Sequence, residues 1–342
     1  MFAKRSQNVL DTYMNRLLTV SMRIGVLMLQ SGAEIYRVED SVHRIHLAYC
    51  ASESQVYCVP TTVIASVSLP GGRTATRCVR VSSHCTNLSR MMALSDLCRR
   101  ICLLKPDFDT IDREIDRILS MPVYNSWQTC AAWALVSAGF TMLFGGGFLE
   151  SALSIIPAVL VALLSFALGL LHVNAYFNLL LESFCIGAIS MSFSLLSPSI
   201  HSDAIIIGVL MNLVPGLALT NCIRDVMAGD LTAGVSKLSD VILTAVSIAL
   251  GAVGAALLMG GGFLIMDNLP FFLAMACCLF GCLGFSMSNN VRRRTLLWAN
   301  IGGCVALAVY LLTPVSLGVA MRSFFGTLAA ALYSEIMARL RK

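Results

Sequence analysis

The residues most able to do chemistry in this sequence are polar groups inside long apolar stretches. Glu182 stands about two helical turns inside one such stretch, at 176–197. An ionisable side chain at membrane depth marks a proton or cation site, or else a carboxylate that bonds to a neighbouring helix. We keep both interpretations of Glu182 open.

A second candidate is the run from Asn212 to Pro215-Gly216, inside a predicted span at 204–222. Proline removes a helical hydrogen bond and glycine loosens the same turn. A Pro–Gly pair at membrane depth frees backbone carbonyls, as in the broken helices that bind substrates and ions in secondary transporters. The alternative is a structural kink. We favour a functional site, with Asn212 near the freed backbone.

Charged residues follow this run, at the mouth of the span. Arg224, Asp225 and Asp230 suit a gate or a salt bridge at this place.

A dense polar motif occupies residues 30–44 of the charged first part of the chain. On a helix, Arg37 can reach Asp40 or Ser41, and Asp40 can reach Arg44. The pattern is typical of a salt-bridged helix surface, and a functional role stays open beside it. The motif residues that we single out are Gly32, Glu34, Arg37 and Glu39.

No motif for catalysis or metal binding stands out. The five His show neither a triad order nor a metal-ligand spacing. Cys98 and Cys102 share a helix face, without a His/Cys pair to complete a zinc pattern. We therefore predict no catalytic residue, no metal and no cofactor. The net charge of +5 on 342 residues also argues against a nucleic-acid partner.

The elements that hold these residues follow from a change in composition near residue 120. The first 120 residues carry 15 of the 24 Lys+Arg and 11 of the 19 Asp+Glu, and long apolar runs follow. Runs of about 20 apolar residues match the hydrocarbon core of a bilayer. The sequence thus predicts a membrane protein, a polytopic α-helical bundle of about eight transmembrane helices. The predicted spans are 128–148, 151–171, 176–197, 204–222, 239–259, 269–288, 295–313 and 316–338.

The loop charges predict the orientation of these spans. Alternate connections hold the basic residues, and every basic connection falls on the side of the N-terminal domain. The positive-inside rule makes that side cytoplasmic. We expect a multi-pass protein of the cytoplasmic (inner) membrane, with the N-terminus and the C-terminus in the cytoplasm.

The first part of the chain predicts a cytoplasmic α+β domain. Apolar residues at helical spacing and runs of β-branched residues indicate helices and strands, respectively. The expected helices are 7–31, 33–49, 86–104 and 109–119, and the expected strands are 55–59, 61–69 and 74–81. The predicted domains are 1–120, cytoplasmic; 121–267, a first module of five transmembrane helices; and 268–342, a partial second module of three helices.

Three stretches together resemble the threonine/serine exporter family. They are Gly32-Ala-Glu-Ile-Tyr-Arg-Val-Glu39, the strand entry Pro60-Thr-Thr62, and the long stretch from Val214 through Arg224-Asp225 to Gly234. The match is to the family's N-terminal module and covers roughly residues 10–265. Residues 268–342 resemble the start of the second module, which normally has five spans and sometimes stands on a separate chain.

The resemblance implies a secondary exporter of small hydrophilic amino acids, threonine and serine, driven by the proton gradient. Its partners would be the small amino-acid substrate and the lipid bilayer. A second transmembrane module on another chain, or a homo-oligomer, would complete the transporter. We expect substrate binding at Asn212, Pro215, Gly216 and Asn221. Proton coupling or gating is expected at Glu182, Arg224, Asp225 and Asp230.

Other functions remain open at this point. Some relatives handle dicarboxylates, so a succinate-like substrate is the first alternative. A membrane-bound hydrolase or sensor is the second, and it would need a cleft that gathers Glu34, Glu39, Asp40 and His43. A non-transporting subunit of a membrane assembly is the third.

Overall fold

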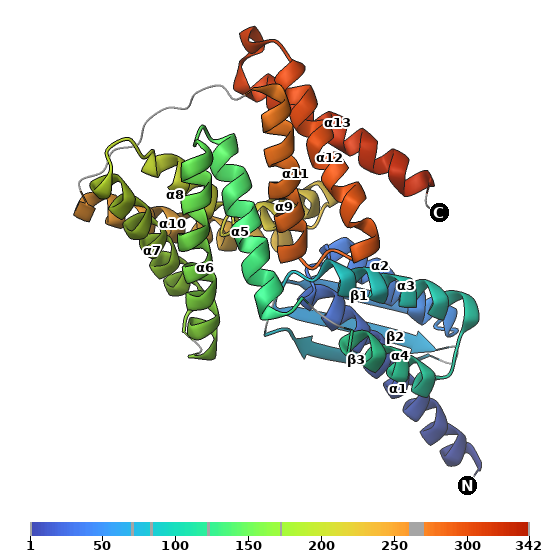
Figure 1. Cartoon of the computed structure of the whole chain (residues 1–342). Coiled ribbons are helices and arrows are strands. Elements are labelled where there is room, and N and C mark those ends of the chain that lie inside the picture. The colour runs from blue at the N-terminus through green and yellow to red at the C-terminus, as the bar shows by residue number, and fades with distance from the viewer. Residues whose placement is uncertain are drawn as a thin grey trace. The chain divides into compact units, whose positions relative to one another are not determined.

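The computed structural model describes residues 2–69, 72–82, 85–121, 124–171, 173–259 and 270–340. The chain forms two compact units (Figure 1). The first comprises Met1–Val123 and Gly216–Val241, and the second comprises Tyr124–Pro215 and Ile242–Lys342. A segment from the middle of the chain therefore belongs to the same unit as the N-terminal residues.

The first unit combines helices with a small sheet. Its helices are α1 (Phe2–Gln30), α2 (Ile35–Ala48), α3 (Leu88–Leu104), α4 (Phe108–Leu119), α9 (Gly216–Ala228) and the beginning of α10 (Leu231–Met259). Its strands are β1 (Glu53–Val59), β2 (Thr62–Leu69) and β3 (Arg73–Arg80), in an antiparallel sheet of order β1-β2-β3.

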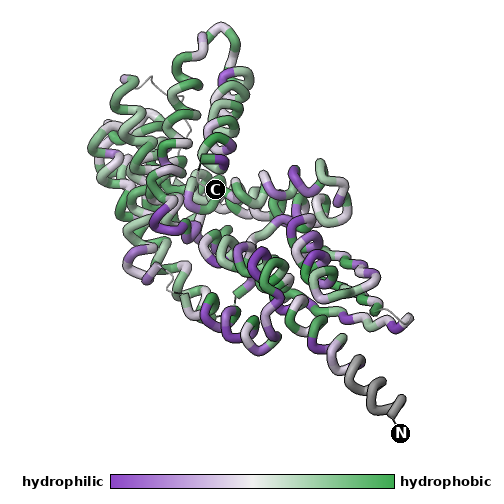
Figure 2. Tube along the Cα trace, turned by 90° about the vertical axis from the view of Figure 1, so that its right-hand side faces the viewer, coloured by the Kyte–Doolittle hydropathy of each residue, from purple (hydrophilic) through white to green (hydrophobic). Residues whose placement is uncertain are grey.

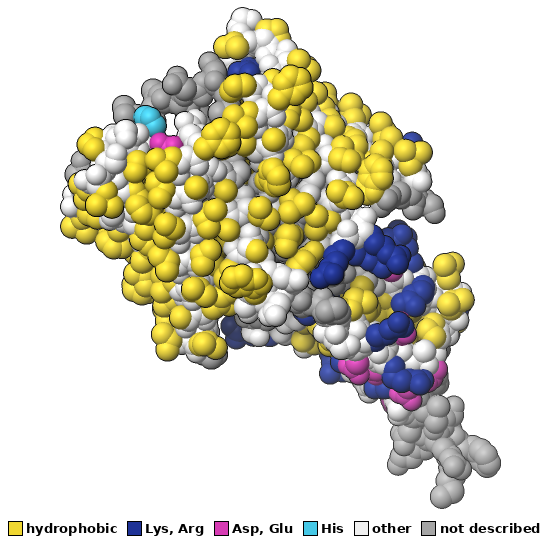
Figure 3. All heavy atoms as spheres, viewed as in Figure 1, with side chains coloured by type: hydrophobic (Ala, Val, Ile, Leu, Met, Phe, Trp, Pro, Cys, Tyr) yellow, Lys and Arg dark blue, Asp and Glu magenta, His cyan; other side chains and the backbone are white. Residues whose placement is uncertain are grey.

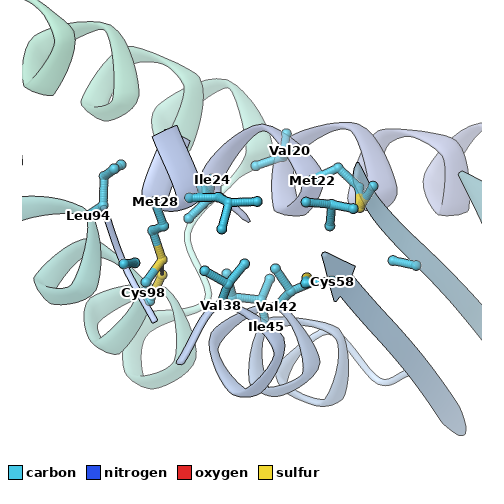
Figure 4. Packing of buried hydrophobic residues seen from close by; sticks show 14 of the residues in the cluster. Val20, Met22, Ile24, Met28, Val38, Val42, Ile45, Cys58, Leu94 and Cys98 are labelled. Carbon is cyan, nitrogen blue, oxygen red and sulfur yellow. Dashed lines mark hydrogen bonds between the residues drawn. The ribbon is translucent and has the colours of Figure 1, made fainter. Parts of the chain in front are cut away.

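One face of this sheet packs against helices, and alternation along β2 sets that face. Val63, Ala65 and Val67 are fully buried, while the intervening side chains are at least partly exposed. Successive side chains of a strand point to opposite faces, so this pattern buries one side only. Helices α1, α2 and α3 supply the facing side chains (Figure 4), among them Ile24, Met28, Val38, Val42, Leu94 and Cys98.

The corner between α1 and α2 depends on Gly32. The N–H of Ala33 donates to the carbonyl of Met28, and the N–H of Gly32 donates to that of Leu29. This is the Schellman pattern of helix termination, which places the residue after the cap in the left-handed region. Gly32 has φ +89°, a conformation that glycine adopts without a Cβ penalty.

The second unit contains helices and no strand in its described residues. Its elements are α5 (Ser126–Leu143), α6 (Phe148–Leu170), α7 (Ala175–Leu196), α8 (Ser202–Leu210), the rest of α10, α11 (Phe271–Ser288), α12 (Arg293–Leu312), the 3₁₀ turn η1 (Val315–Leu317) and α13 (Gly318–Leu340). These helices are hydrophobic along most of their length (Figure 2). Hydrophobic side chains cover their visible surface, whereas charged side chains gather on the first unit (Figure 3).

Six helices in the described part of the chain are long and apolar enough to cross a membrane. They are α6, α7, α10, α11, α12 and the segment Val315–Leu340. The chain is therefore built as a polytopic membrane protein. Two of the eight predicted spans, 128–148 and 204–222, have no counterpart among these six.

The predicted span 204–222 is divided between two helices at its Pro–Gly pair. Helix α8 ends at Leu210, and α9 begins at Gly216 in the other unit. Proline disfavours a helical conformation in the preceding residue, and Pro215 has no N–H to offer the carbonyl of Met211 four residues earlier. The Pro–Gly pair is thus a complete break between two helices rather than a kink inside one.

Candidate functional site

Two groups of polar residues contain the predicted site, one in each unit. The first surrounds Asp225 on α9, whose carboxylate is 0% exposed. Its Oδ1 accepts a hydrogen bond of 3.1 Å from the N–H of Ile35, the first residue of α2. Its Oδ2 accepts one of 2.7 Å from the ammonium of Lys237 on α10. A carboxylate is stabilised at a helix N-terminus by the free N–H groups and by the helix dipole.

Glu34 lies beside this contact and is only 5% exposed. The guanidinium of Arg224 donates to its Oε1 at 2.5 Å, and the Nε of Arg37 lies 3.4 Å from its Oε2. Glu34 precedes α2 and makes no side-chain cap of its own. The amide of Asn221 completes the contact by donating to the carbonyl of Gly32 at 3.3 Å.

We call this group of residues the α2–α9 clasp. It joins two motifs that lie about 190 residues apart in the sequence. Buried charges are costly unless they are paired and hydrogen-bonded, and both buried carboxylates of the clasp have basic partners. The clasp comprises Gly32, Glu34, Ile35, Arg37, Asn221, Arg224, Asp225 and Lys237.

Two more acidic residues lie close to the clasp. Glu39 accepts a hydrogen bond of 2.7 Å from the N–H of Cys58, which ties α2 to β1. Burial raises the pKa of Glu39, and the nearby carboxylates of Asp230 and Asp225 raise it further, against the effect of that hydrogen bond. Burial and Asp225 also raise the pKa of Asp230, while Lys237 lowers it. Glu39 and Asp230 thus add two acidic groups beside the clasp.

The second group surrounds Asn212 in the second unit. Its amide nitrogen donates to the hydroxyl of Ser137 on α5 at 2.9 Å, and to the carbonyls of Val209 and, at 3.5 Å, Trp133. Its Oδ1 is buried without a hydrogen-bond partner in the described part of the chain. An unsatisfied buried acceptor is unusual and marks a place where a donor group would bind favourably.

Helices α5 and α8 approach closely just before this point. A Cβ at Gly208 would meet the backbone of Thr141, at 2.5 Å from its nitrogen. The hydroxyl of Thr141 is also buried without a partner among the described residues. Ser137 and Thr141 stand one turn apart on α5, so Asn212 ends a polar seam between two helices. We call Ser137, Thr141 and Asn212 the α5–α8 seam.

Glu182 lies on α7 and is 4% exposed. The hydroxyl of Ser165 on α6 is within hydrogen-bonding reach of its carboxylate. No basic residue of the described chain forms an ion pair with it within 4.0 Å. Its position two turns into α7 agrees with the sequence pattern.

The structure thus divides the predicted site. Asn212 and Pro215 belong to the second unit, and Gly216, Asn221, Arg224, Asp225 and Asp230 belong to the first. Three of the four residues that a hydrolase would need have separate partners. Glu34 bonds to Arg224, Glu39 bonds to the backbone of Cys58, and Asp40 pairs with Arg44 on the exposed face of α2.

Sequence reasoning missed two partners. Lys237 neutralises Asp225 from the start of α10, and Ser137 orients the Asn212 amide from α5. A basic residue shortly after an acidic loop is a weak signal for the first. Ser137 is a lone serine among apolar residues, and nothing in the sequence indicated that it would contact Asn212.

Six helices long and apolar enough to cross a membrane, together with the helix break at Pro215-Gly216, define a polytopic membrane protein. The comparison with family models agrees. Residues 19–259 match the family described as "Putative threonine/serine exporter", and residues 274–342 match "Threonine/Serine exporter, ThrE". The chain belongs to the threonine/serine exporter family.

A curated relative supports the same family. It is a "Probable threonine/serine exporter" from Mycobacterium tuberculosis, 21% identical over 251 residues, or 73% of this chain. The chain spans about half the length of that relative, since the match covers 47% of it. No solved structure matches the chain.

Proposed function

We propose that this chain carries out secondary-active efflux of small hydrophilic amino acids, threonine and serine, across the cytoplasmic membrane. The observation that carries the proposal is the buried, unpartnered Oδ1 of Asn212 next to a broken helix. An α-ammonium group offers three donors, and a buried amide oxygen beside unpaired carbonyls is a complementary set of acceptors.

The broken helix adds a second acceptor. Pro215 has no N–H for the carbonyl of Met211, so the helical partner of this carbonyl is missing. Asn212 and Met211 are adjacent in the second unit, at the end of α8. We therefore assign Asn212 and the backbone before Pro215-Gly216 to substrate binding. Asn221 bonds to Gly32 within the clasp, and we assign it to the clasp instead.

Glu182 is the proposed proton carrier. It is a buried carboxylate on an apolar helix, bonded by an uncharged hydroxyl, and no described basic residue lies within salt-bridge distance of it. Ionisable residues in such surroundings commonly form proton relays in transporters. Asp225, by contrast, is fixed by Lys237 and by the N–H of Ile35, which favours a gating role for the clasp.

The clasp also supports the proposed orientation. Residues 216–241 and the N-terminal helices form one compact unit, and we propose that this unit lies on one side of the membrane. The intervening Tyr124–Pro215 must then cross the membrane an even number of times. Arg224 and Lys237 stand on the same side, which the positive-inside rule makes cytoplasmic.

The test is efflux of labelled threonine from proteoliposomes that contain the full chain, with and without a proton gradient. Asn212→Ala removes the acceptor, and we expect the half-saturating threonine concentration to rise at least about tenfold, the effect of losing a hydrogen bond to a charged group. The matched control is Ser247→Ala, because Ser247 bonds to the carbonyl of Leu243 on its own helix. Equal transport by both variants would remove Asn212 from the site.

Two further arms separate the parts of the proposal. Glu182→Gln should leave threonine binding intact and abolish the stimulation by the gradient. If the wild-type chain gives no efflux, the same assay with a co-expressed second transmembrane module decides whether this chain requires one. Absence of efflux in both preparations contradicts the proposed function.

A further inference from the structure

Helix α9 carries a row of exposed apolar side chains at a spacing of four residues. Leu219, Ile223 and Met227 are 42%, 51% and 83% exposed, respectively. Residues four apart lie on the same face of a helix, so the three form one stripe. Leu231 and Val235, in the first turns of α10, are exposed as well. We call these five residues the apolar stripe.

The opposite face of α9 is fixed to the first unit. Cys222 and Asp225 are buried there, and Asp225 bonds to both Ile35 and Lys237. Rotation of α9 to bury the stripe would expose these two bonds to water and leave the Ile35 N–H without its acceptor. The clasp therefore holds the stripe outward, and α9 is an amphipathic helix.

Chain connectivity limits where this stripe can lie. Ala228, the last residue of α9, is three residues from Leu231, the first of α10. Three residues span at most about 10 Å. Helix α10 is long and apolar enough to cross a membrane, and its exposed apolar side chains continue after the stripe with Ile242 and Leu243. The stripe is thus continuous in sequence with a surface that lipid must cover.

A charged side chain accompanies the stripe. Arg224, next to Ile223, is half exposed although one of its nitrogens bonds to Glu34. Amphipathic helices in the membrane interface combine an apolar face with basic residues near the lipid phosphates. If the stripe bound a soluble partner, nothing would require its exposed apolar side chains to continue into α10, a helix long and apolar enough to cross a membrane.

We propose that α9 is an interfacial helix, with the apolar stripe inserted into the bilayer surface on the side of the first unit. Leu219, Ile223 and Met227 then lie at the boundary between the headgroups and the acyl chains. The clasp ties this surface helix to α2, so the first unit is held against the lipid. This inference does not depend on the transported substrate.

Photo-crosslinking of the full chain in vesicles of phosphatidylethanolamine and phosphatidylglycerol tests the proposal. A benzophenone side chain replaces Ile223 in one variant and Leu103 in the control, since Leu103 is an 82% exposed apolar residue of α3 in the same unit. We expect several-fold more phospholipid adduct from position 223 than from position 103. Adducts with peptides of this chain or of a second copy, or equal lipid yields, would overturn the proposal.

The depth of insertion provides a second, independent readout. Fluorescence of Ile223→Trp, with Ile223→Phe as the background, is measured in lipids brominated near the headgroup or near the chain end. An interfacial stripe predicts stronger quenching by the bromines near the headgroup. Stronger quenching by the deep bromines, or none by either lipid, contradicts an interfacial position.

Discussion

The α2–α9 clasp and the α5–α8 seam both contain buried polar groups, but the two differ in the charge of these groups and in their partners. In the clasp, the buried carboxylates of Glu34 and Asp225 have basic partners, and Asp225 also has a backbone donor. Oε2 of Glu34 accepts no hydrogen bond within the described residues, but the Nε of Arg37 lies 3.4 Å from it. In the seam, no group is charged, and the oxygen of Asn212 has no partner among the described residues. An unpaired charge would destabilise the fold far more than an unpaired amide oxygen. The comparison teaches that the clasp holds structure while the seam keeps an acceptor available.

The largest expected effect comes from breaking the clasp at Asp225. Asp225→Ala leaves the Lys237 ammonium and the Ile35 N–H without their acceptor. Removing one partner of a buried ion pair typically costs about 3–5 kcal/mol. Hydrogen exchange of α2 in the full-length protein measures the corresponding loss in opening free energy.

The matched control for this experiment is Asp96→Ala. Asp96 is half exposed and pairs with Arg99 on its own helix at 3.6 Å. Its loss should change the opening free energy by no more than about 0.5 kcal/mol. A similar loss in both variants would mean that the clasp does not hold α2.

A double-mutant cycle on Glu34 and Arg224 measures how strongly these two residues of the clasp are coupled. We expect a coupling energy of about 1–3 kcal/mol from Glu34→Gln and Arg224→Gln, because Glu34 is nearly inaccessible to water. The exposed pair of Asp40 and Arg44 serves as the reference and should couple by about 0.3–0.5 kcal/mol. Equal coupling energies would refute a special role for the Glu34 pair.

The seam gives a smaller effect, on transport rather than on folding. Ser137→Ala removes the acceptor that orients the Asn212 amide. A neutral hydrogen bond contributes about 1 kcal/mol, so the half-saturating threonine concentration should rise about fivefold. Hydrogen exchange of α2 should not change. Ser154→Ala, which removes a bond to the carbonyl of Ser151 within α6, is the control expected to transport normally.

The smallest effect concerns pH, and it is confined to the first unit. Burial raises the pKa of Glu39, so its folded-state pKa exceeds the unfolded one. Such a group adds stability below its unfolded pKa and loses that contribution as pH rises through the folded pKa. Wild-type protein should therefore lose stability relative to Glu39→Gln as the pH rises above the ordinary glutamate pKa of about 4.5. Thermal unfolding across this range measures the difference, and the opposite slope would contradict it.

Much of the local structure was predictable from the sequence. Apolar residues at helical spacing indicated α1 and α2, and Gly32 marked their boundary because the chain there needs a positive φ. Charge density and apolar runs indicated a polytopic membrane protein, as the six candidate spans show. Pro215-Gly216 indicated a helix break within 204–222, but not that the residues before and after it belong to different compact units.

The candidate site was predicted residue by residue but not as an arrangement. The sequence identified Asn212, Arg224 and Asp225 as polar residues in or next to an apolar span, and Glu34 as part of a dense polar motif. Only the tertiary structure decided that the first three meet across about 190 residues and that Asn212 lies with Ser137. The physical reason is that periodicity specifies which face of a helix is polar. The partner of that face is chosen by packing and by the need of each buried charge for a counter-charge.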